Sequence, residues 1–270
     1  MQKRKPKLGQ NFLIDDEARH RIADALGDVT AKTVIEIGPG HGAITEILAA
    51  RARRLICIEL DEHLASELRF KFRDHPNVEV AKGDVLKAEF PFLLAPDTAK
   101  ASVVGNLPYY ITSDILLALF ANCHLFDRAV LMMQREVADR VAAAPGVREY
   151  GLLTATTQMY AQVASLFTLP PSAFSPPPDV FSSVVRLEFA SRFTELAVDA
   201  PGFDTFLKQS FGQKRKTLAN NLRAANFSRD LLENSWPAQV PREARAEALT
   251  LQQMAAVYRA LHPAAPTPSS

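Results

Sequence analysis

A chain of 270 residues can form one large α/β domain with a small second domain, or two modest domains. Its 47% hydrophobic and 23% charged residues are typical of a globular protein and exclude a fibrous or disordered chain. The formal net charge of +1 gives no support to a nucleic-acid ligand, so such a ligand would have to be bound by local clusters of charge.

No apolar run reaches the roughly 18 residues that a membrane span requires, and no secretory signal is recognisable near the N-terminus. The two cysteines, Cys57 and Cys123, are far apart in apolar sequence, which is typical of reduced core residues in a cytoplasmic protein. The six histidines show no metal-ligand spacing. We therefore expect a cytoplasmic protein without metal or membrane partner, and a monomer by default.

The first two-thirds of the chain alternates β-branched apolar runs with helical segments, which predicts a mostly parallel sheet covered by helices. Helices are expected at 16–26, 43–50, 62–71, 113–121, 135–143 and 151–161. Strands are expected at 33–37, 54–59, 78–81, 102–105, 129–133, 164–168 and 183–189. Seven strands ending in a hairpin-like pair favour the Rossmann-like α/β sheet of class I methyltransferases, because a dehydrogenase would more naturally end in another strand–helix crossover.

Beyond about residue 191 the strand pattern stops and apolar residues recur at helical spacing. Helices are expected at 203–210, 217–225, 229–233 and 244–261. The predicted domains are a methyltransferase domain at 1–190 with a basic N-terminal arm, a small all-helical domain at 191–262, and a disordered tail at 263–270.

A glycine turn between a strand and a helix predicts a nucleoside cofactor. Gly38 and Gly40 permit a tight turn and close approach of a ligand, although NAD-binding proteins share this pattern. Glu59 ends the second strand, where a carboxylate can accept hydrogen bonds from both ribose hydroxyls. Asp84 ends the third strand and either meets the adenine amino group or only caps the next helix. These positions share the carboxyl edge of the sheet, where such folds bind ligands.

Glu36 separates two kinds of nucleoside cofactor. A carboxylate just before the glycine turn has no obvious place beside the pyrophosphate of NAD. It suits a cofactor with an amino-acid group and a sulfonium, because it can organise backbone and water around the positive charge. We therefore expect S-adenosylmethionine.

The segment Asn106-Leu107-Pro108-Tyr109 follows the fourth strand and predicts a site for an adenine amino group. A proline turn with a capping asparagine, and no ligand, would have the same sequence pattern. The Asn106 side-chain oxygen and the Pro108 carbonyl could accept both amino hydrogens, which would localise the nitrogen lone pair toward the methyl group. Tyr109 would stack on the base. Phe174, in a proline-rich loop, is either a core residue or the second aromatic face of the pocket.

Two basic clusters are candidates for RNA phosphate contact or are simply solvated surface. The first lies in the N-terminal arm and the second in the helical region. Their residues are Lys3, Arg4, Lys5 and Lys7, and Lys214, Arg215 and Lys216.

Together these motifs resemble the ribosomal RNA adenine dimethyltransferases, and the bacterial small-subunit members most. The matching segments are KLGQNFL at 7–13, EIGPGHG at 36–42, NLPY at 106–109, Phe174-x-Pro-x-Pro and FGQKRKTL at 211–218. The resemblance implies that Asn11 and Leu13 join the other site residues in binding S-adenosylmethionine. It also implies N6,N6-dimethylation of two adjacent adenosines in a hairpin near the 3′ end of 16S rRNA, within a small subunit or its precursor.

One segment departs from the family pattern, because DVFS at 179–182 stands where many relatives have KVDS. This puts RNA contacts of that loop in doubt, but not the chemistry. Three alternatives stay open: a large-subunit methyltransferase of the antibiotic-resistance type, a non-catalytic ribosome-assembly factor, and an NAD-dependent oxidoreductase. Glu36 disfavours the oxidoreductase, and the intact 106–109 motif disfavours the assembly factor.

Overall fold

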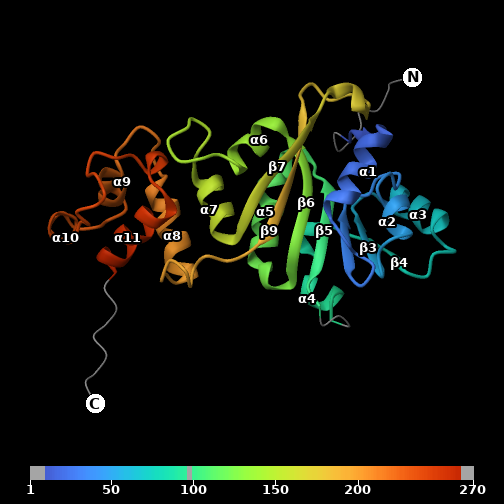
Figure 1. Ribbon diagram of the computed structural model, residues 1–270, viewed down its shortest axis with the longest axis horizontal. Coiled ribbons are helices and arrows are strands. Elements are labelled where there is room, and N and C mark those ends of the chain that lie inside the picture. Colours follow the sequence, from blue (N-terminus) through green and yellow to red (C-terminus); the bar gives the residue numbers. More distant parts are fainter. Residues whose placement is uncertain (1–9, 96–98, 263–270) are drawn as a thin grey trace, which may run out of the picture. The chain divides into compact units, whose positions relative to one another are not determined.

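The computed structural model describes residues 10–95 and 99–262 (Figure 1). It divides into two compact units, the first formed by 1–138 with 162–189 and the second by 139–161 with 190–270, each within its described part. The basic residues Lys3, Arg4, Lys5 and Lys7 and the tail 263–270 lie outside the described residues.

The first unit is built on a seven-stranded sheet of order β4-β3-β2-β5-β6-β9-β7. The five neighbouring strands β4, β3, β2, β5 and β6 run parallel to one another, and β9 runs antiparallel to β6. The inner strands are buried along nearly their whole length, as expected for apolar runs covered on both faces. The strands are β2 (Thr33–Ile37), β3 (Arg54–Glu59), β4 (Val78–Lys82), β5 (Ala101–Asn106), β6 (Phe126–Gln134), β7 (Ala161–Leu169) and β9 (Ser182–Phe189).

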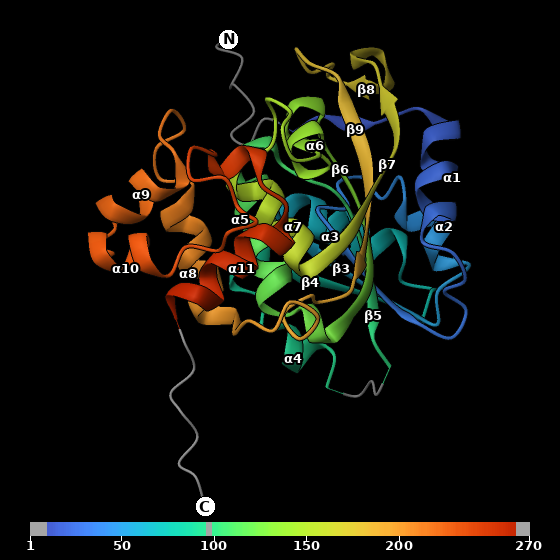
Figure 2. The ribbon, with the colours of Figure 1, turned by 60° about the vertical axis from the view of Figure 1, so that its left-hand side comes forward.

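Helices cover both faces of this sheet. Figure 2 shows α1 and α2 on one side and α4 and α5 on the other. Apolar residues of α1, α2 and α3 form one buried cluster with alternate residues of the strands. Asp15 and Asp61 cap α1 and α3 by accepting backbone N–H bonds. The helices are α1 (Asp16–Ala25), α2 (Thr45–Ala49), α3 (Glu62–Lys71), α4 (Phe90–Leu93), α5 (Thr112–Ala121) and α6 (Arg135–Val141), the last of which continues into the second unit.

A second, two-stranded sheet was not predicted. Strand β1 (Phe12–Leu13) pairs antiparallel with β8 (Phe174–Ser175), and Leu13 lies opposite Phe174. The pairing holds part of the proline-rich loop against the beginning of the described chain.

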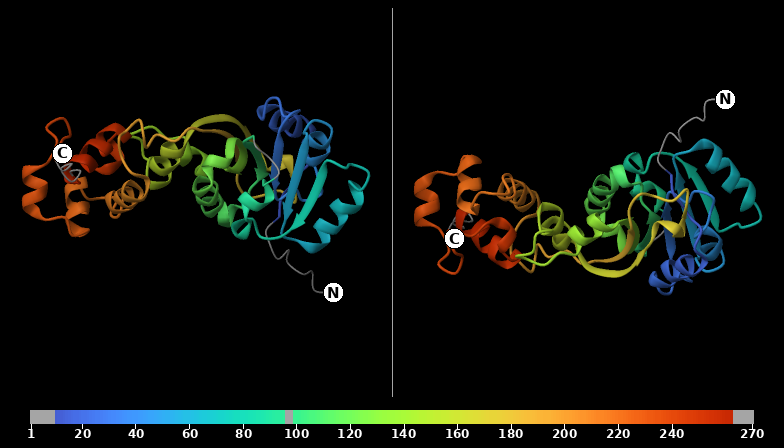
Figure 3. Two further views of the ribbon diagram at one scale, coloured as in Figure 1. Left: turned by 90° about the horizontal axis from the view of Figure 1, so that it is seen from below. Right: turned by 90° about the horizontal axis from the view of Figure 1, so that it is seen from above.

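The second unit is helical (Figure 3). It has its own buried apolar cluster. Phe203, Phe206 and Tyr258 pack their rings together with centroids 5.4–5.8 Å apart. Its remaining helices are α7 (Leu152–Tyr160), α8 (Ala200–Ser210), α9 (Leu218–Ala224), α10 (Arg229–Asn234) and α11 (Leu251–Leu261).

The observed unit boundaries differ from the predicted domains in one respect. Residues 139–161 were assigned to the first domain but belong to the second unit. The reason is packing, because Tyr150, Ala155 and Met159 are buried in the same cluster as Phe203. The helix expected at 244–261 is also shorter, since only a 3₁₀ turn at Ala246–Ala248 precedes α11. The predicted seven-stranded sheet is confirmed.

Within the described part of the chain, no helix is long and apolar enough to cross a membrane. The same residues contain no group of three or more acidic, histidine or cysteine side chains placed to hold a metal ion.

Candidate cofactor and adenine site

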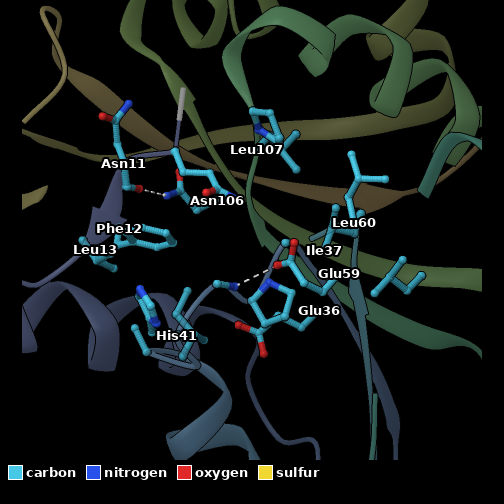
Figure 4. Close-up of a pocket in the computed structure, with 18 of the residues that line it drawn as sticks. Asn11, Phe12, Leu13, Glu36, Ile37, His41, Glu59, Leu60, Asn106 and Leu107 are labelled. Carbon is cyan, nitrogen blue, oxygen red and sulfur yellow. Dashed lines mark hydrogen bonds between the residues drawn. The ribbon is translucent and has the colours of Figure 1, made fainter. Parts of the chain in front are cut away.

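A pocket of about 310 Å³ opens at the carboxyl ends of β2, β3, β4 and β5 (Figure 4). Its volume is within the range of small-molecule sites. All the residues expected to bind the cofactor line it, together with two more of those expected to bind the adenine. These residues are Asn11, Leu13, Gly38, Gly40, Glu59, Asp84, Asn106, Pro108 and Tyr109.

The glycine turn after β2 forms one wall of the pocket. Gly38 and Gly40 have φ of +64° and +59°, which is the left-handed region that favours glycine. A Cβ atom at Gly40 would lie 2.8 Å from the Phe12 ring. The Phe12 ring in turn lies 4.4 Å from the His41 ring, measured between centroids. The turn therefore requires glycine both for its backbone and for the packing of β1 over it.

Glu59 is 4% exposed at the end of β3. One carboxylate oxygen accepts the Gly40 N–H at 3.1 Å and the other accepts the Asp61 N–H at 2.9 Å. Burial raises the pKa of Glu59, and these two hydrogen bonds oppose the rise. The carboxylate is thus fixed at the pocket by the glycine turn and by the start of α3.

Glu36 lies behind the glycine turn with 2% of its surface exposed. Its carboxyl accepts the Thr45 hydroxyl at 2.7 Å and the Cys57 thiol at 3.8 Å. Burial, and to a smaller extent the nearby Glu59, raise the pKa of Glu36 to about 7. The two hydrogen bonds act in the opposite direction and lower it. Glu36 therefore titrates in the neutral range.

Glu36→Gln should flatten the pH dependence of folding stability between pH 5 and 7. The pKa of Glu36 is near 7 in the folded state and 4.5 is its ordinary value, so the unfolded chain ionises first as pH rises. Below pH 4.5 the group is protonated in both states and does not reduce folding stability. It costs roughly 3 kcal/mol of stability once pH exceeds 7. Glutamine can still accept the Thr45 hydroxyl without ionising. Urea unfolding measured across this range tests it, and identical pH profiles for the variant and the wild type would contradict it.

Asn106 ends β5 with its side chain at the pocket. Its amide nitrogen donates to the Asn11 carbonyl at 2.9 Å (Figure 4). This bond fixes which end of the amide is the donor, so the side-chain oxygen remains as an acceptor. The N-terminal GQNFL segment and the NLPY segment thus meet at one point of the pocket wall.

The Pro108 carbonyl, which was expected to accept an adenine amino hydrogen, is already engaged in hydrogen bonds within the described structure. That oxygen already accepts the Ile111 N–H at 3.2 Å and the Thr112 hydroxyl at 3.1 Å. Both of its lone pairs are used by the turn itself. The Leu107 carbonyl accepts no hydrogen bond from the described residues, and Leu107 also lines the pocket. Next to Asn106, the Leu107 carbonyl is thus a backbone acceptor that the described residues leave free.

Tyr109 and Asp84 are both held at the pocket by hydrogen bonds. The Tyr109 hydroxyl lies 2.7 Å from the Ser182 hydroxyl. This hydrogen bond fixes the hydroxyl end of the tyrosine ring. Partial burial raises the pKa of Tyr109, so it is neutral at physiological pH. Asp84 caps the following 3₁₀ turn by accepting the Leu86 N–H, and it also lines the pocket. The two interpretations of Asp84 are therefore compatible.

Phe174 does not line the pocket, contrary to the interpretation of it as a second aromatic face. Its side chain is 2% exposed and belongs to the apolar cluster that includes Leu13. The β1–β8 pairing explains this, because it places Phe174 opposite Leu13. The core interpretation of Phe174 is the one that this structure supports.

The second basic cluster lies in the helical unit. Lys214, Arg215 and Lys216 are all exposed on the turn between α8 and α9. The Lys214 ammonium donates to the Arg148 carbonyl at 3.2 Å. This placement agrees with either solvated surface or phosphate contact.

Several pocket residues were not singled out from the sequence, and Phe12, His41 and Leu107 are three of them. Phe12 lies in the KLGQNFL segment and His41 in the EIGPGHG segment, so both could have been found from these motifs. The role of Leu107 belongs to its backbone carbonyl, for which residue type gives no signal.

The sheet order and the nucleoside-sized pocket define an α/β protein of the class I methyltransferase type. The structure is similar to a dimethyladenosine transferase from Plasmodium falciparum, with a TM-score of 0.76 and 26% identity over 91% of this chain and 95% of that one. It is also similar to the 23S rRNA methyltransferase ErmE, with a TM-score of 0.72 and 26% identity over 93% of this chain and 100% of that one.

The chain belongs to the ribosomal RNA adenine dimethylase family, whose sequence profile matches residues 1–262. A relative named Ribosomal RNA small subunit methyltransferase A, from Acidobacterium capsulatum, is 54% identical over 96% of this chain and 92% of its own length. Another of the same name, from Koribacter versatilis, is 49% identical over 96% and 94%.

Proposed function

We propose that this enzyme transfers methyl groups from S-adenosylmethionine to N6 of two adjacent adenosines in a hairpin near the 3′ end of 16S rRNA, during assembly of the small ribosomal subunit. The observation that carries the adenine target is the Asn106 amide, fixed by Asn11 with its oxygen left as an acceptor at the pocket. The names of the relatives from Acidobacterium and Koribacter support the small subunit as substrate, since the similarity extends over nearly the whole chain.

The residues present fit S-adenosylmethionine. The buried Glu59 carboxylate would hold the ribose hydroxyls, and Asp84 would hold the adenine amino group. The turn at Gly38 and Gly40 lets the ligand approach the backbone closely. Glu36 lies behind this turn and favours a positively charged ligand. When bound, S-adenosylmethionine supplies an electrophilic methyl group.

The substrate nitrogen has to be activated, because its lone pair is delocalised into the adenine ring. The Asn106 side-chain oxygen and the Leu107 carbonyl would each accept one amino hydrogen. Holding both hydrogens in this way favours tetrahedral geometry and directs the lone pair toward the methyl group. Rate enhancement then comes from positioning and fixed dipoles, and the nitrogen loses its proton only after it has been methylated.

Tyr109 would stack on the target base. Its hydroxyl bond to Ser182 restrains the ring, so little side-chain freedom is lost when a base binds. An extruded base held against an aromatic ring is the usual arrangement in enzymes that modify nucleobases.

The likeness to ErmE makes a large-subunit substrate the second candidate. The decisive experiment supplies methyl-labelled S-adenosylmethionine with undermethylated small subunits, large subunits or naked rRNA, followed by nucleoside analysis. Labelled dimethyladenosine from small subunits supports the proposal. Label only in large-subunit rRNA would favour the second candidate, and cofactor binding without any transfer would favour an assembly factor.

Replacing Lys214, Arg215 and Lys216 with glutamine should weaken RNA binding and flatten its salt dependence. The slope of log affinity against log salt should fall by about 0.7 to 0.9 for each phosphate that the protein no longer neutralises. Arg229→Gln is the matched control, because it removes an exposed charge in the same unit that is already paired with Glu233. Binding titrations at several salt concentrations measure the slopes. An unchanged slope in the triple variant would identify the cluster as solvated surface.

A further inference from the structure

Arg135 and Phe181 form an exposed cation–π pair in the first unit. Arg135 is the first residue of α6, directly after β6, and Phe181 directly precedes β9. The Arg135 N–H donates to the Phe181 carbonyl at 2.9 Å, and the guanidinium carbon lies 5.1 Å from the Phe181 ring centroid. A backbone bond and a side-chain contact thus hold these two residues together.

The pair is exposed to solvent, and its guanidinium is a positive charge held against an aromatic ring. Phe181 is 42% exposed and Arg135 is exposed as well. Among the described residues Arg135 forms no ion pair. A single exposed ring needs no explanation, but a ring stacked with an unpaired guanidinium presents both an aromatic surface and a charge.

The pair is connected to the adenine pocket through Ser182, although neither of its residues lines the pocket. Phe181 adjoins Ser182, whose hydroxyl contacts that of Tyr109 on the pocket wall. The residue after Tyr109, Tyr110, also lines the pocket and is 62% exposed. A base bound against Tyr109 would therefore have nucleotides on either side within reach of exposed aromatic and cationic groups.

We propose that Arg135 and Phe181 form a stacking platform for a nucleotide that flanks the target adenosine. This inference rests on the proposed function, since it requires an RNA strand at the pocket. Single-stranded RNA is the occupant that matches the surface, because unstacked bases pack on aromatic rings and guanidinium planes while the positive charge attracts phosphates.

The test uses fluorescence of 2-aminopurine, which is quenched when the base stacks. Single-stranded RNA hexamers with two adjacent adenosines carry 2-aminopurine on the 5′ or the 3′ side of the pair. Full-length protein should quench one of the two. Phe181→Leu and Phe181→Asp should abolish this quenching and weaken RNA binding about tenfold, the size expected for one stacked base. The aspartate would pair with Arg135 and so keep the loop in place without a ring. Phe181→Tyr should behave as the wild type.

A matched control exists in the same unit. Phe70 on α3 is an exposed ring with Arg73 stacked 4.4 Å from its centroid, and it does not line the pocket. Phe70→Leu should leave quenching and RNA affinity unchanged. Arg135→Gln distinguishes stacking from phosphate binding, because removing a charge that neutralises a phosphate reduces the salt slope, whereas removing a stacked ring does not.

The platform is overturned if neither hexamer is quenched by the wild type, or if both Phe181 variants quench as the wild type does. Quenching needs only binding, so this result does not depend on methyl transfer. Failure of the proposed function would appear separately, as absence of labelled dimethyladenosine from small subunits with intact wild-type quenching.

Discussion

Asn106→Ala should reduce the rate of methyl transfer roughly 100- to 1000-fold, the size typical of losing one preorganised hydrogen bond to a transition state. The side-chain oxygen is one of two acceptors available for the adenine amino group, and alanine offers no replacement. Cofactor affinity should fall much less, since Glu59 and the glycine turn are unaffected. Single-turnover transfer to small subunits and calorimetric cofactor binding separate the two effects.

Asn122→Ala is a suitable control for this variant. The Asn122 amide also donates to a backbone carbonyl at 2.9 Å, that of Ala118, but it lies outside the pocket. It should change stability slightly and leave transfer unaltered. Asn106→Asp keeps an acceptor but cannot donate to the Asn11 carbonyl, so it should be intermediate in rate. Unchanged turnover in Asn106→Ala would rule out the amino-group mechanism.

The sheet could be predicted because its strands are marked by local hydrophobic runs. The strands at 33–37 and 54–59 and the helix at 62–71 have the predicted ends. Each combines a long apolar pattern with a clear terminal signal, such as the Asp61 cap. The carboxyl-edge positions of Glu59 and Asn106 follow from this topology, so their meeting in one pocket was predictable as well.

The β1–β8 pairing could not be predicted, because two residues per strand are too few for any periodicity. The choice between the two interpretations of Phe174 therefore stayed open, since its place opposite Leu13 and in the buried cluster is visible only in the fold. Similarly, the assignment of 139–161 to the second unit depends on side chains such as Tyr150 packing with residues distant in sequence.

The engagement of the Pro108 carbonyl could not be predicted for a different reason. The motif indicated four residues around the amino group, but not which carbonyl among them is free. That depends on the hydrogen bonds of the turn, where Ile111 and Thr112 both donate to Pro108. Lone-pair occupancy is a property of the folded turn and has no signature in residue type.

Glu59→Gln should weaken S-adenosylmethionine binding about 100-fold, because hydrogen bonds to a charged acceptor are worth roughly 1.5–3 kcal/mol each. Both carboxylate oxygens already accept backbone N–H groups, from Gly40 and Asp61. In the glutamine variant an NH₂ group would replace one oxygen and face the N–H of Gly40 or Asp61. That buried N–H would lose its acceptor, which would destabilise the glycine turn or the start of α3. Stability should therefore fall by about 1–3 kcal/mol as well.

Measuring binding and unfolding together separates the two roles of Glu59. Glu62→Gln is the control, since Glu62 is an exposed carboxylate three residues away, paired with Arg69 and Lys82 and absent from the pocket. It should alter neither quantity measurably. If Glu59→Gln lowered stability but left cofactor affinity at the wild-type value, Glu59 would serve only to brace the turn. The ribose would then have to be held by another group. A loss of affinity larger than the loss of stability identifies the carboxylate as a direct ligand.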